Sequence, residues 1–450
     1  MNREVRLTTG SIVPQLVRLC LPLLGANVLQ QLYNIINSLV VTYYIGDNAF
    51  AALGVAESVM NLFIYAITGA CMGASVLVAR FYGEENYPRL RQQLYVSMTL
   101  VGGCVLTAVL LGQLFLPQLL RLIQTPQELM GDVSAYLRII LTGMIFTFTY
   151  NYLAATLRAV GNTKAALYFL LLSLGYNLVC AWVLVAVLKL GIVGTAIATS
   201  SAQMLSTGMC FIYLKRHYPM LMIRKEDRKL EQELIGLTSS YAVVAALQQS
   251  SLYLGKLMIQ GAVNGLGTAS ISAFTAVNRV ENFVQAFGIS GCEATAIFVA
   301  QNKGAGDEKR CLQGFARGSA GLIGTGLIFS AILHFVPEPL VGIFLAGEPE
   351  SLVLAASYLR WIGWFYFLSF TGHAFVSWYR GTGRMKVTFW GTTVQIAVRV
   401  VGTYLLVNTM GLDSVALSTG IGWMVIVLFH GSVFVLERKG IWPKRMEKTA

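Results

Sequence analysis

The chain has 450 residues, of which 56% are hydrophobic and only 12% are charged, and its formal net charge at pH 7 is +12. Its mean hydropathy is +0.64, whereas soluble domains carry about 25% charged residues, so the composition excludes an ordinary soluble protein. The basic residues lie in short links between apolar runs and form no basic face with interleaved aromatic residues, which argues against a nucleic-acid partner.

Apolar runs long enough to cross about 30 Å of hydrocarbon recur along the whole chain. No small-residue cleavage site follows the first run, so no signal peptide is expected. The sequence therefore predicts an all-α integral membrane protein with about twelve transmembrane helices. In chain order they lie near 13–44, 49–80, 92–116, 133–156, 165–188, 192–214, 235–261, 266–301, 315–336, 351–379, 387–408 and 412–436.

The links between these runs alternate in charge. The first link holds Asp47 alone, the second holds Arg80, Arg89 and Arg91, and this alternation continues to the basic C-terminal end. Because Lys and Arg are retained on the cytoplasmic side, the pattern predicts that both termini are cytoplasmic, in a multi-pass protein of the cell inner (plasma) membrane. Both ends on one side require an even number of crossings, which agrees with twelve.

Three pairs of segments repeat at a nearly constant distance along the chain. The pairs are Gly83 with Gly304 (304 − 83 = 221), Arg158 with Arg380 (380 − 158 = 222) and Gly191 with Gly411 (411 − 191 = 220). Each half contains six crossings, so the repeat predicts two six-helix lobes related by a pseudo-two-fold axis along the membrane normal.

The repeat also predicts how the chain divides. We expect an N-terminal six-helix lobe over 1–214, a cytoplasmic linker over 215–234 and a C-terminal six-helix lobe over 235–450. The linker carries many charges, and its pattern favours a short amphipathic helix on the cytosolic face. Parallel halves of this kind are typical of a rocking transporter that exposes one site to each side in turn.

Over nearly its whole length the chain resembles the multidrug and toxic compound extrusion (MATE) transporters of the multidrug/oligosaccharidyl-lipid/polysaccharide flippase superfamily. The resemblance is carried by residues 10–46, ALGVAES from Ala52, VARFYGEEN from Val78, LRAVGNTK from Leu157, VAQNKGAGD from Val299 and YRGTGRMK from Tyr379. It implies twelve helices in two lobes with a V-shaped central cleft. It also implies antiport, in which a proton or a sodium ion enters while an amphipathic, often cationic, organic compound leaves.

One position departs from the family pattern. Many prokaryotic members carry an acidic residue in the first helix where this chain has Asn37, and that carboxylate is implicated in cation coupling. An amide cannot titrate, so a proton-carrying role at Asn37 is in doubt, although its oxygen could still help to ligate sodium. Asn34, one turn earlier, is a further polar candidate, with bonding to a neighbouring helix as the alternative.

Ionisable residues inside the apolar runs are the other candidates, because burying a charge in the bilayer costs about 2.5–3.5 kcal/mol. Glu57 lies roughly 15 Å beyond Asp47 and is expected near mid-membrane, facing a cationic substrate or Arg279 of the other half. Lys256 and Glu281 are candidates for a pair that changes protonation with conformation. The alternative is a static ion network of Lys256, Arg279 and Glu281 that holds helices together.

Two weaker candidates complete the set. Glu293 follows Glu281 in the same run and could instead lie near the cytoplasmic end, and His373 is a possible pH-sensitive group or a hydrogen-bonded structural histidine. We expect no cofactor and no metal site, because no His and Cys spacing fits one. The expected partners are small organic substrates and the lipid bilayer, with H+ or Na+ as the coupling cation, and we expect a monomer.

Three other classes of protein fit the sequence less well. An intramembrane enzyme has little support, since the four histidines are far apart and no HExxH or clustered Asp motif occurs. A flippase for lipid-linked oligosaccharides or lipids would need an arginine-rich cleft, and only Arg279 and Arg399 are candidates. A cation channel would need a carbonyl filter or a ring of acids, and neither is visible.

Overall fold

The computed structural model describes residues 6–45, 47–345 and 347–441, with the side chains of 34–51 outside the description. In these ranges every regular element is a helix. The chain forms two compact units. The N-terminal unit contains Gly25–Ala246, and the C-terminal unit contains Leu7–Leu24 with residues 247–441.

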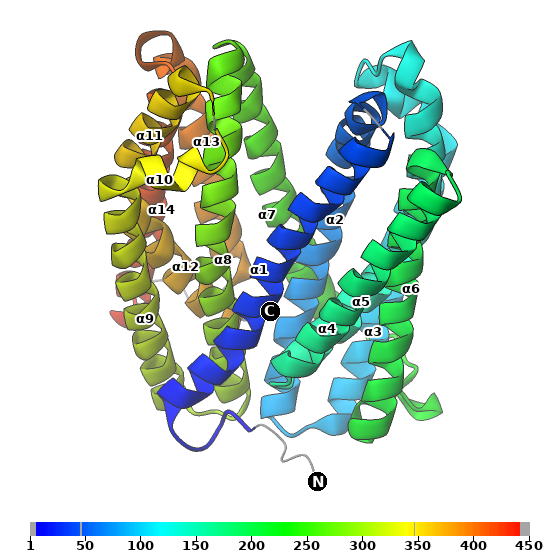
Figure 1. The fold of residues 1–450 in the computed structure, drawn as a ribbon. Coiled ribbons are helices and arrows are strands. Elements are labelled where there is room, and N and C mark those ends of the chain that lie inside the picture. The colour runs from blue at the N-terminus through cyan, green and yellow to red at the C-terminus, as the bar shows by residue number, and fades with distance from the viewer. Residues whose placement is uncertain (1–5, 46, 346, 442–450) are drawn as a thin grey trace. The chain divides into compact units, whose positions relative to one another are not determined.

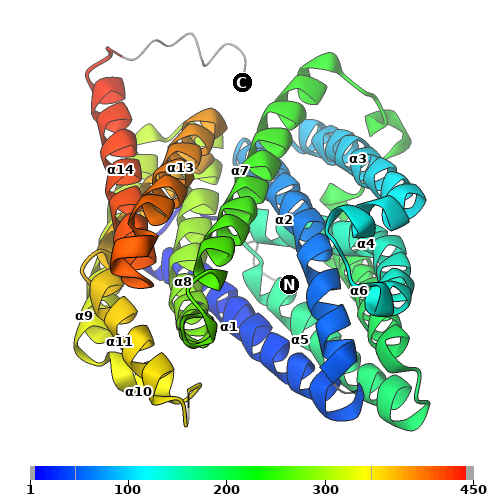
Figure 2. The ribbon, with the colours of Figure 1, turned by 90° about the horizontal axis from the view of Figure 1, so that it is seen from above.

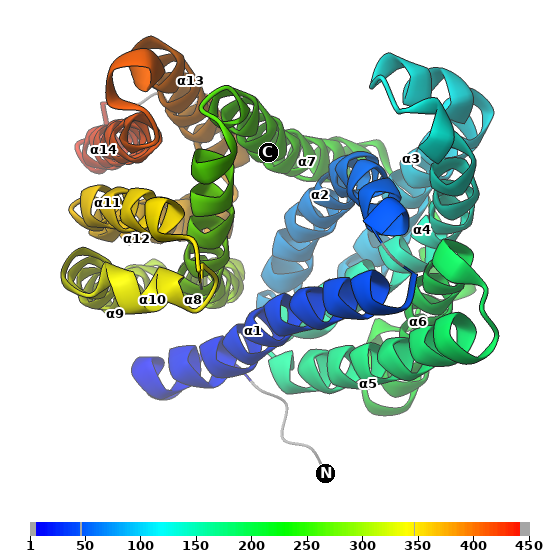
Figure 3. The ribbon, with the colours of Figure 1, turned by 45° about the horizontal axis from the view of Figure 1, so that its top comes forward.

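The N-terminal unit is a bundle in which α4 packs against both α2 and α6, and α5 lies alongside α6 (Figure 3). A single π turn, Val183–Val187, extends α5. The unit contains α2 (Asp47–Gly83), α3 (Tyr87–Leu122), α4 (Met130–Ala159), α5 (Thr163–Trp182) and α6 (Gly191–His217), together with the later part of α1 (Ile12–Ile45) and the first part of α7 (Gln232–Asn264).

The C-terminal unit contains the start of α1 and the remainder of α7. In this unit α8, α9 and α12 pack against one another, and α13 lies beside α14 (Figures 1 and 2). Its other helices are α8 (Thr268–Gly304), α9 (Glu308–Phe335), α10 (Pro337–Gly342), α11 (Pro349–Gly363), α12 (Tyr366–Gly381), α13 (Met385–Met410) and α14 (Asp413–Arg438).

The twelve expected spans correspond to α1–α9, the pair α11 and α12, α13 and α14, which confirms the predicted fold class. Among the described residues nine helices are individually long and apolar enough to cross a membrane, or ten with the α11–α12 pair. The sequence predicted one helix over 351–379, but the structure bends there by 52°. The backbone N–H of Phe367 donates to Ser330 Oγ of α9 at 2.9 Å. This contact satisfies an unpaired donor in the first turn of α12.

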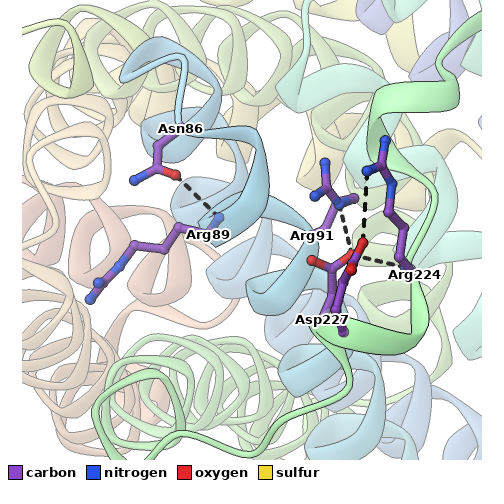
Figure 4. Close-up of polar contacts among 6 residues, drawn as sticks. Asn86, Arg89, Arg91, Arg224 and Asp227 are labelled. Atoms are coloured by element: carbon purple, nitrogen blue, oxygen red, sulfur yellow. Dashed lines mark hydrogen bonds and ion pairs between the residues drawn. The ribbon is translucent and has the colours of Figure 1, made fainter.

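The duplication predicted from the sequence is visible in the helix ends. At the start of α3 the side chain of Asn86 accepts a hydrogen bond from the backbone N–H of Arg89 at 3.2 Å (Figure 4). At the start of α9 the side chain of Asp307 accepts one from the N–H of Arg310 at 2.8 Å. Both are N-caps of the type that satisfies an unpaired donor in the first helical turn. The two capping residues are 221 positions apart (307 − 86 = 221), and so are the two arginines that they cap (310 − 89 = 221).

The same two arginines hold the start of the first helix of the opposite repeat. Arg89 forms an ion pair with Glu233 at the start of α7, and Arg310 donates to the carbonyl of Leu7 and to Gln15 Oε1, each at 3.0 Å. Each arginine thus contacts the start of a helix that belongs to the other repeat.

The compact units divide within α1 and within α7. The lobe boundaries expected from the sequence, at 214 and 235, stay a prediction of where the repeats meet.

The linker does not form the amphipathic helix predicted from its charge pattern. It makes two three-residue 3₁₀ turns, Pro219–Leu221 and Lys225–Asp227. The carboxylate of Asp227 accepts from Arg91 Nε of α3 at 2.7 Å and from the backbone N–H of Arg224 at 2.8 Å (Figure 4). Because this buried ion pair ties the middle of a short segment to α3, the chain turns tightly there instead of continuing as a helix.

Candidate functional site

A chain of hydrogen bonds joins three helices of the N-terminal unit. The hydroxyl of Tyr33 in α1 donates to Asn177 Oδ1 in α5 at 2.6 Å, and Asn177 Nδ2 donates to Thr199 Oγ1 in α6 at 3.3 Å. Asn177 is only 4% exposed, so its amide has little access to other partners. The arrangement holds three side-chain oxygens close together inside an apolar bundle.

A carboxyl group and a second phenol lie near this chain. Tyr136 of α4 is buried and lies within electrostatic range of both Glu57 of α2 and Tyr33. Within the described part of the chain Glu57 makes no ion pair. We call these residues the N-terminal polar cluster: Tyr33, Glu57, Tyr136, Asn177 and Thr199.

The ligand chemistry of the N-terminal polar cluster is that of hard cations. Carboxylate, amide and hydroxyl oxygens suit cations that prefer oxygen ligands, and a carboxyl group can also hold a proton. The residues the structure describes contain no group of three or more His, Cys, Asp or Glu side chains able to hold a metal ion. A cation bound here would therefore depend on one carboxylate and on neutral oxygens.

The C-terminal unit has a polar cluster of its own, centred on Glu281 of α8. The hydroxyl of Tyr358 in α11 donates to Glu281 Oε2 at 3.4 Å. The hydroxyl of Tyr366 in α12 donates to the backbone carbonyl of Glu281 at 3.5 Å. Both tyrosines are fully buried, so one phenol contacts the carboxylate of Glu281 and the other contacts its backbone.

Two basic groups complete this C-terminal polar cluster. Arg399 of α13 and Lys256 of α7 both lie within electrostatic range of Glu281, and Thr419 of α14 lies near Tyr358. Neither base forms a direct ion pair with the carboxylate among the described residues. We define the C-terminal polar cluster as Lys256, Glu281, Tyr358, Tyr366, Arg399 and Thr419.

The two clusters share three equivalent positions of the repeat. Tyr136 corresponds to Tyr358 (358 − 136 = 222), and Thr199 corresponds to Thr419 (419 − 199 = 220), at the same offsets as the repeated segments. The equivalent of Asn177 is Arg399 (399 − 177 = 222), so an amide in one repeat is a guanidinium in the other. The two halves therefore share a tyrosine and a threonine, whereas their carboxylates are not equivalent, because Glu57 and Glu281 are 224 positions apart (281 − 57 = 224).

The candidates from the sequence have different surroundings. Lys256 is exposed and lies within electrostatic range of Glu281 without an ion pair to it among the described residues, whereas the exposed Arg279 has its guanidinium over the Phe344 ring at 5.4 Å. Two residues along a helix turn the side chain by about 200°, which explains why Arg279 and Glu281 point differently.

The remaining candidates lie outside the two clusters. His373 Nδ1 bonds to the carbonyl of Ser369 at 2.8 Å, within its own helix. Glu293 is half-buried, twelve residues beyond Glu281 on α8, and so about 18 Å along its axis. Asn34 and Asn37 are part of α1, but their side chains lie outside the described residues.

Sequence reasoning missed Tyr33, Tyr136 and Asn177 and left the direction of Arg399 open. Neutral polar residues in apolar runs are commonly structural, and nothing in the local pattern distinguished these. The signal that could have found them was the repeat itself, because applying its offset to every polar residue pairs tyrosine with tyrosine and threonine with threonine.

Comparisons with known proteins agree with the fold and the duplication. The family model described as MatE matches residues 22–183 and again 245–405, which is more than half of the chain. The chain is 26% identical over 449 residues to a probable multidrug resistance protein, YpnP, of Bacillus subtilis (strain 168), covering 97% of each chain. It is 28% identical over 382 residues to a second probable multidrug resistance protein of that strain, YoeA, covering 83% of this chain and 82% of YoeA.

A solved structure has the same fold. The outward-facing conformation of a multidrug resistance MATE family transporter superposes with a TM-score of 0.91 at 20% identity, covering 99% of this chain and 100% of the other. The family model matches the two repeats separately, as the duplicated helix caps and the paired clusters require. The chain thus belongs to the MATE family.

Proposed function

We propose that the protein is a cation-coupled antiporter, driven by a proton or sodium gradient, that exports small amphipathic or cationic organic compounds. Alternating access would occur by rocking of the two units, in the cytoplasmic membrane, with both ends of the chain in the cytoplasm. The names of its relatives YpnP and YoeA, both described as probable multidrug resistance proteins, support small organic substrates.

The observation that carries this proposal is the N-terminal polar cluster. Glu57 is the acid of the cluster, and the hydroxyl and amide oxygens of Tyr33, Asn177 and Thr199 lie in the same helix bundle. Glu57 is half-buried, and a carboxylate held in an apolar bundle without a paired base costs free energy that a proton or a sodium ion would offset. Binding and release of that cation can therefore bias the conformation of the unit, which is the requirement for coupling.

A dye-efflux assay in everted vesicles tests the proposal. A proton gradient and a sodium gradient are imposed separately, and the wild type is compared with Glu57→Gln and with Glu226→Gln, a matched control in the exposed linker. We expect wild-type efflux to require one of the two gradients, Glu57→Gln to lose that dependence, and Glu226→Gln to behave as wild type.

Two results would contradict the proposal at different points. Efflux by the wild type that needs neither gradient would exclude antiport. Full gradient-driven efflux by Glu57→Gln would show that the coupling cation binds without this carboxylate. Lys256→Met and Glu281→Gln, measured in the same vesicles, report whether the C-terminal polar cluster also contributes.

A further inference from the structure

The linker between α6 and α7 carries a large surplus of exposed positive charge. Residues 215–230 hold six Lys or Arg residues and two acids, Glu226 and Asp227. Asp227 is buried in its ion pair with Arg91 of α3 (Figure 4), so Glu226 is the one exposed acid of this segment and the exposed charge is +5 (6 − 1 = 5). The exposed bases, which we call the linker bases, are Lys215, Arg216, Arg224, Lys225, Arg228 and Lys229.

Two other turns predicted on the cytoplasmic side pair their bases with acids. Arg80 pairs with Glu84 at 3.2 Å between α2 and α3, and Lys303 pairs with Glu308 at 3.1 Å between α8 and α9. Among the described residues Arg224 is the one linker base that forms an ion pair. The linker thus keeps its charge available, beyond the general excess of bases on the cytoplasmic side.

The linker is held against the N-terminal unit along its length. Tyr218 is buried, and its hydroxyl accepts from Asn162 Nδ2, at the start of α5, at 3.0 Å. Leu221 is 2% exposed, and Asp227 accepts from Arg91 of α3 at 2.7 Å. These contacts order the backbone over 218–227 and leave the linker bases on the outer surface. A charged surface that is already ordered loses little conformational entropy when it binds a partner.

The end of α6 indicates where this surface lies relative to lipid. Phe211 and Ile212 are 51% and 52% exposed, and apolar side chains exposed on a transmembrane span are suited to hydrocarbon. Lys215 and Arg216 follow them by one turn on the same face of the helix, about 6 Å further along its axis, where lipid phosphates are expected. At the other end of the linker Leu230 is likewise 51% exposed, so apolar side chains accompany the bases at both ends.

We propose that the linker bases form a binding surface for the phosphate groups of anionic phospholipids. Clusters of about four to eight Lys and Arg beside a span attract anionic lipids, each base by about fivefold. The exposed apolar side chains beside the bases favour a lipid over a soluble polyanion, which has nothing to place against them. The inference goes beyond transport and holds whichever cation drives it; the leaflet, cytoplasmic, follows from the proposed orientation.

Thermal unfolding of the purified full-length protein in a neutral detergent tests the inference. Phosphatidylglycerol is added to the micelles at increasing mole fraction, phosphatidylcholine is added in a parallel series, and tripolyphosphate without lipid is added in a third. A ligand that binds the native state raises the unfolding temperature. The test variant is Lys225→Gln/Lys229→Gln. The matched control is Lys309→Gln/Lys439→Gln, which removes two exposed bases outside the linker.

We expect phosphatidylglycerol to raise the unfolding temperature of the wild type, and phosphatidylcholine and tripolyphosphate to leave it nearly unchanged. Lys225→Gln/Lys229→Gln should bind phosphatidylglycerol about 25-fold more weakly, fivefold for each charge removed. Lys225→Arg/Lys229→Arg, which keeps both charges, and the matched control should respond as the wild type does. All four proteins should unfold at the same temperature in detergent alone, because the substituted side chains are exposed.

Three results would overturn the inference. If the linker variant responds to phosphatidylglycerol as the wild type does, the linker bases do not bind the lipid. If the linker variant and its matched control lose the response equally, only the net charge of the protein matters. If tripolyphosphate stabilises the wild type as strongly as phosphatidylglycerol, the surface takes a soluble polyanion. Since no gradient is applied, a wild type whose efflux needs no gradient would refute the proposed antiport and leave the lipid response intact.

Discussion

The hydroxyl of Tyr33 in α1 donates a hydrogen bond to the side-chain oxygen of Asn177 in α5, with 2.6 Å between the two oxygen atoms. The amide nitrogen of Asn177 donates in turn to Thr199, so the amide has one defined orientation. Asn177 is 4% exposed, so few other groups can reach its amide. The Tyr33 hydroxyl therefore fixes the direction of the amide oxygen.

Removal of the Tyr33 hydroxyl should weaken transport without unfolding the bundle. In Tyr33→Phe the amide loses the donor that orients it, and a hydrogen bond of this type contributes about 1 kcal/mol, equivalent to about a fivefold change. We expect gradient-driven dye efflux to fall by about that factor. The control is Tyr168→Phe, since Tyr168 is on α5 as well but is 61% exposed; equal activities of the two variants would contradict the role of Tyr33.

The linker should depend on Asp227 for its attachment to α3. The side chains of Arg91 and Asp227 are 9% and 6% exposed, and hydrogen bonds to charged groups contribute about 1.5–3 kcal/mol. Asp227→Asn should therefore lower the free energy of unfolding by about 2 kcal/mol, measured by denaturant titration in detergent. Glu226→Gln, one position earlier and 71% exposed, should leave it unchanged, and an equal loss in both variants would refute a specific contact.

This ion pair also predicts a pH dependence. Burial opposes ionisation of Asp227, but hydrogen bonds from Arg91 and Arg224 outweigh it and lower the pKa of this carboxyl below its ordinary value. A lowered pKa contributes stability that is complete above the unfolded-state value, about 3.9, and that disappears as the pH falls through the folded-state value. The stability difference between wild type and Asp227→Asn should thus be constant from neutral pH to about 5 and should shrink below about 4. A difference that instead shrinks near neutral pH would contradict this assignment.

Close helix packing in the N-terminal unit should not tolerate a methyl group at Gly73. A Cβ at this position of α2 would overlap the backbone carbonyl of Tyr241 in α7, which cannot move aside as a side-chain end can. Overpacking of this kind costs about 1–3 kcal/mol, so Gly73→Ala should lower the unfolding temperature. Gly54 lies on the same helix with nothing within 4 Å of its Cβ position, and Gly54→Ala should be neutral or slightly stabilising. The packing argument fails if the two variants unfold at the same temperature.

The helix content, the number of spans and the internal duplication could all be predicted from the sequence. The bilayer explains this, because its thickness requires apolar runs of one length and leaves every backbone group to be satisfied within a helix. The pattern of apolar runs and charged links was therefore sufficient. The bend between α11 and α12 was not visible in that pattern, because the contact of Phe367 with Ser330 comes from another helix.

The polar clusters show where prediction from sequence ends. Glu57 and Glu281 stood out because a charged residue in an apolar run is costly wherever it points. Tyr33, Asn177 and Thr199 did not, since they are neutral and separated by up to 166 positions (199 − 33 = 166), and only the packing of α1, α5 and α6 brings them together. The apolar runs were enough to single out the charged residues within them, whereas which of these are exposed, as Arg279 and Lys256 are, and which oxygens surround the others depends on how the helices face one another.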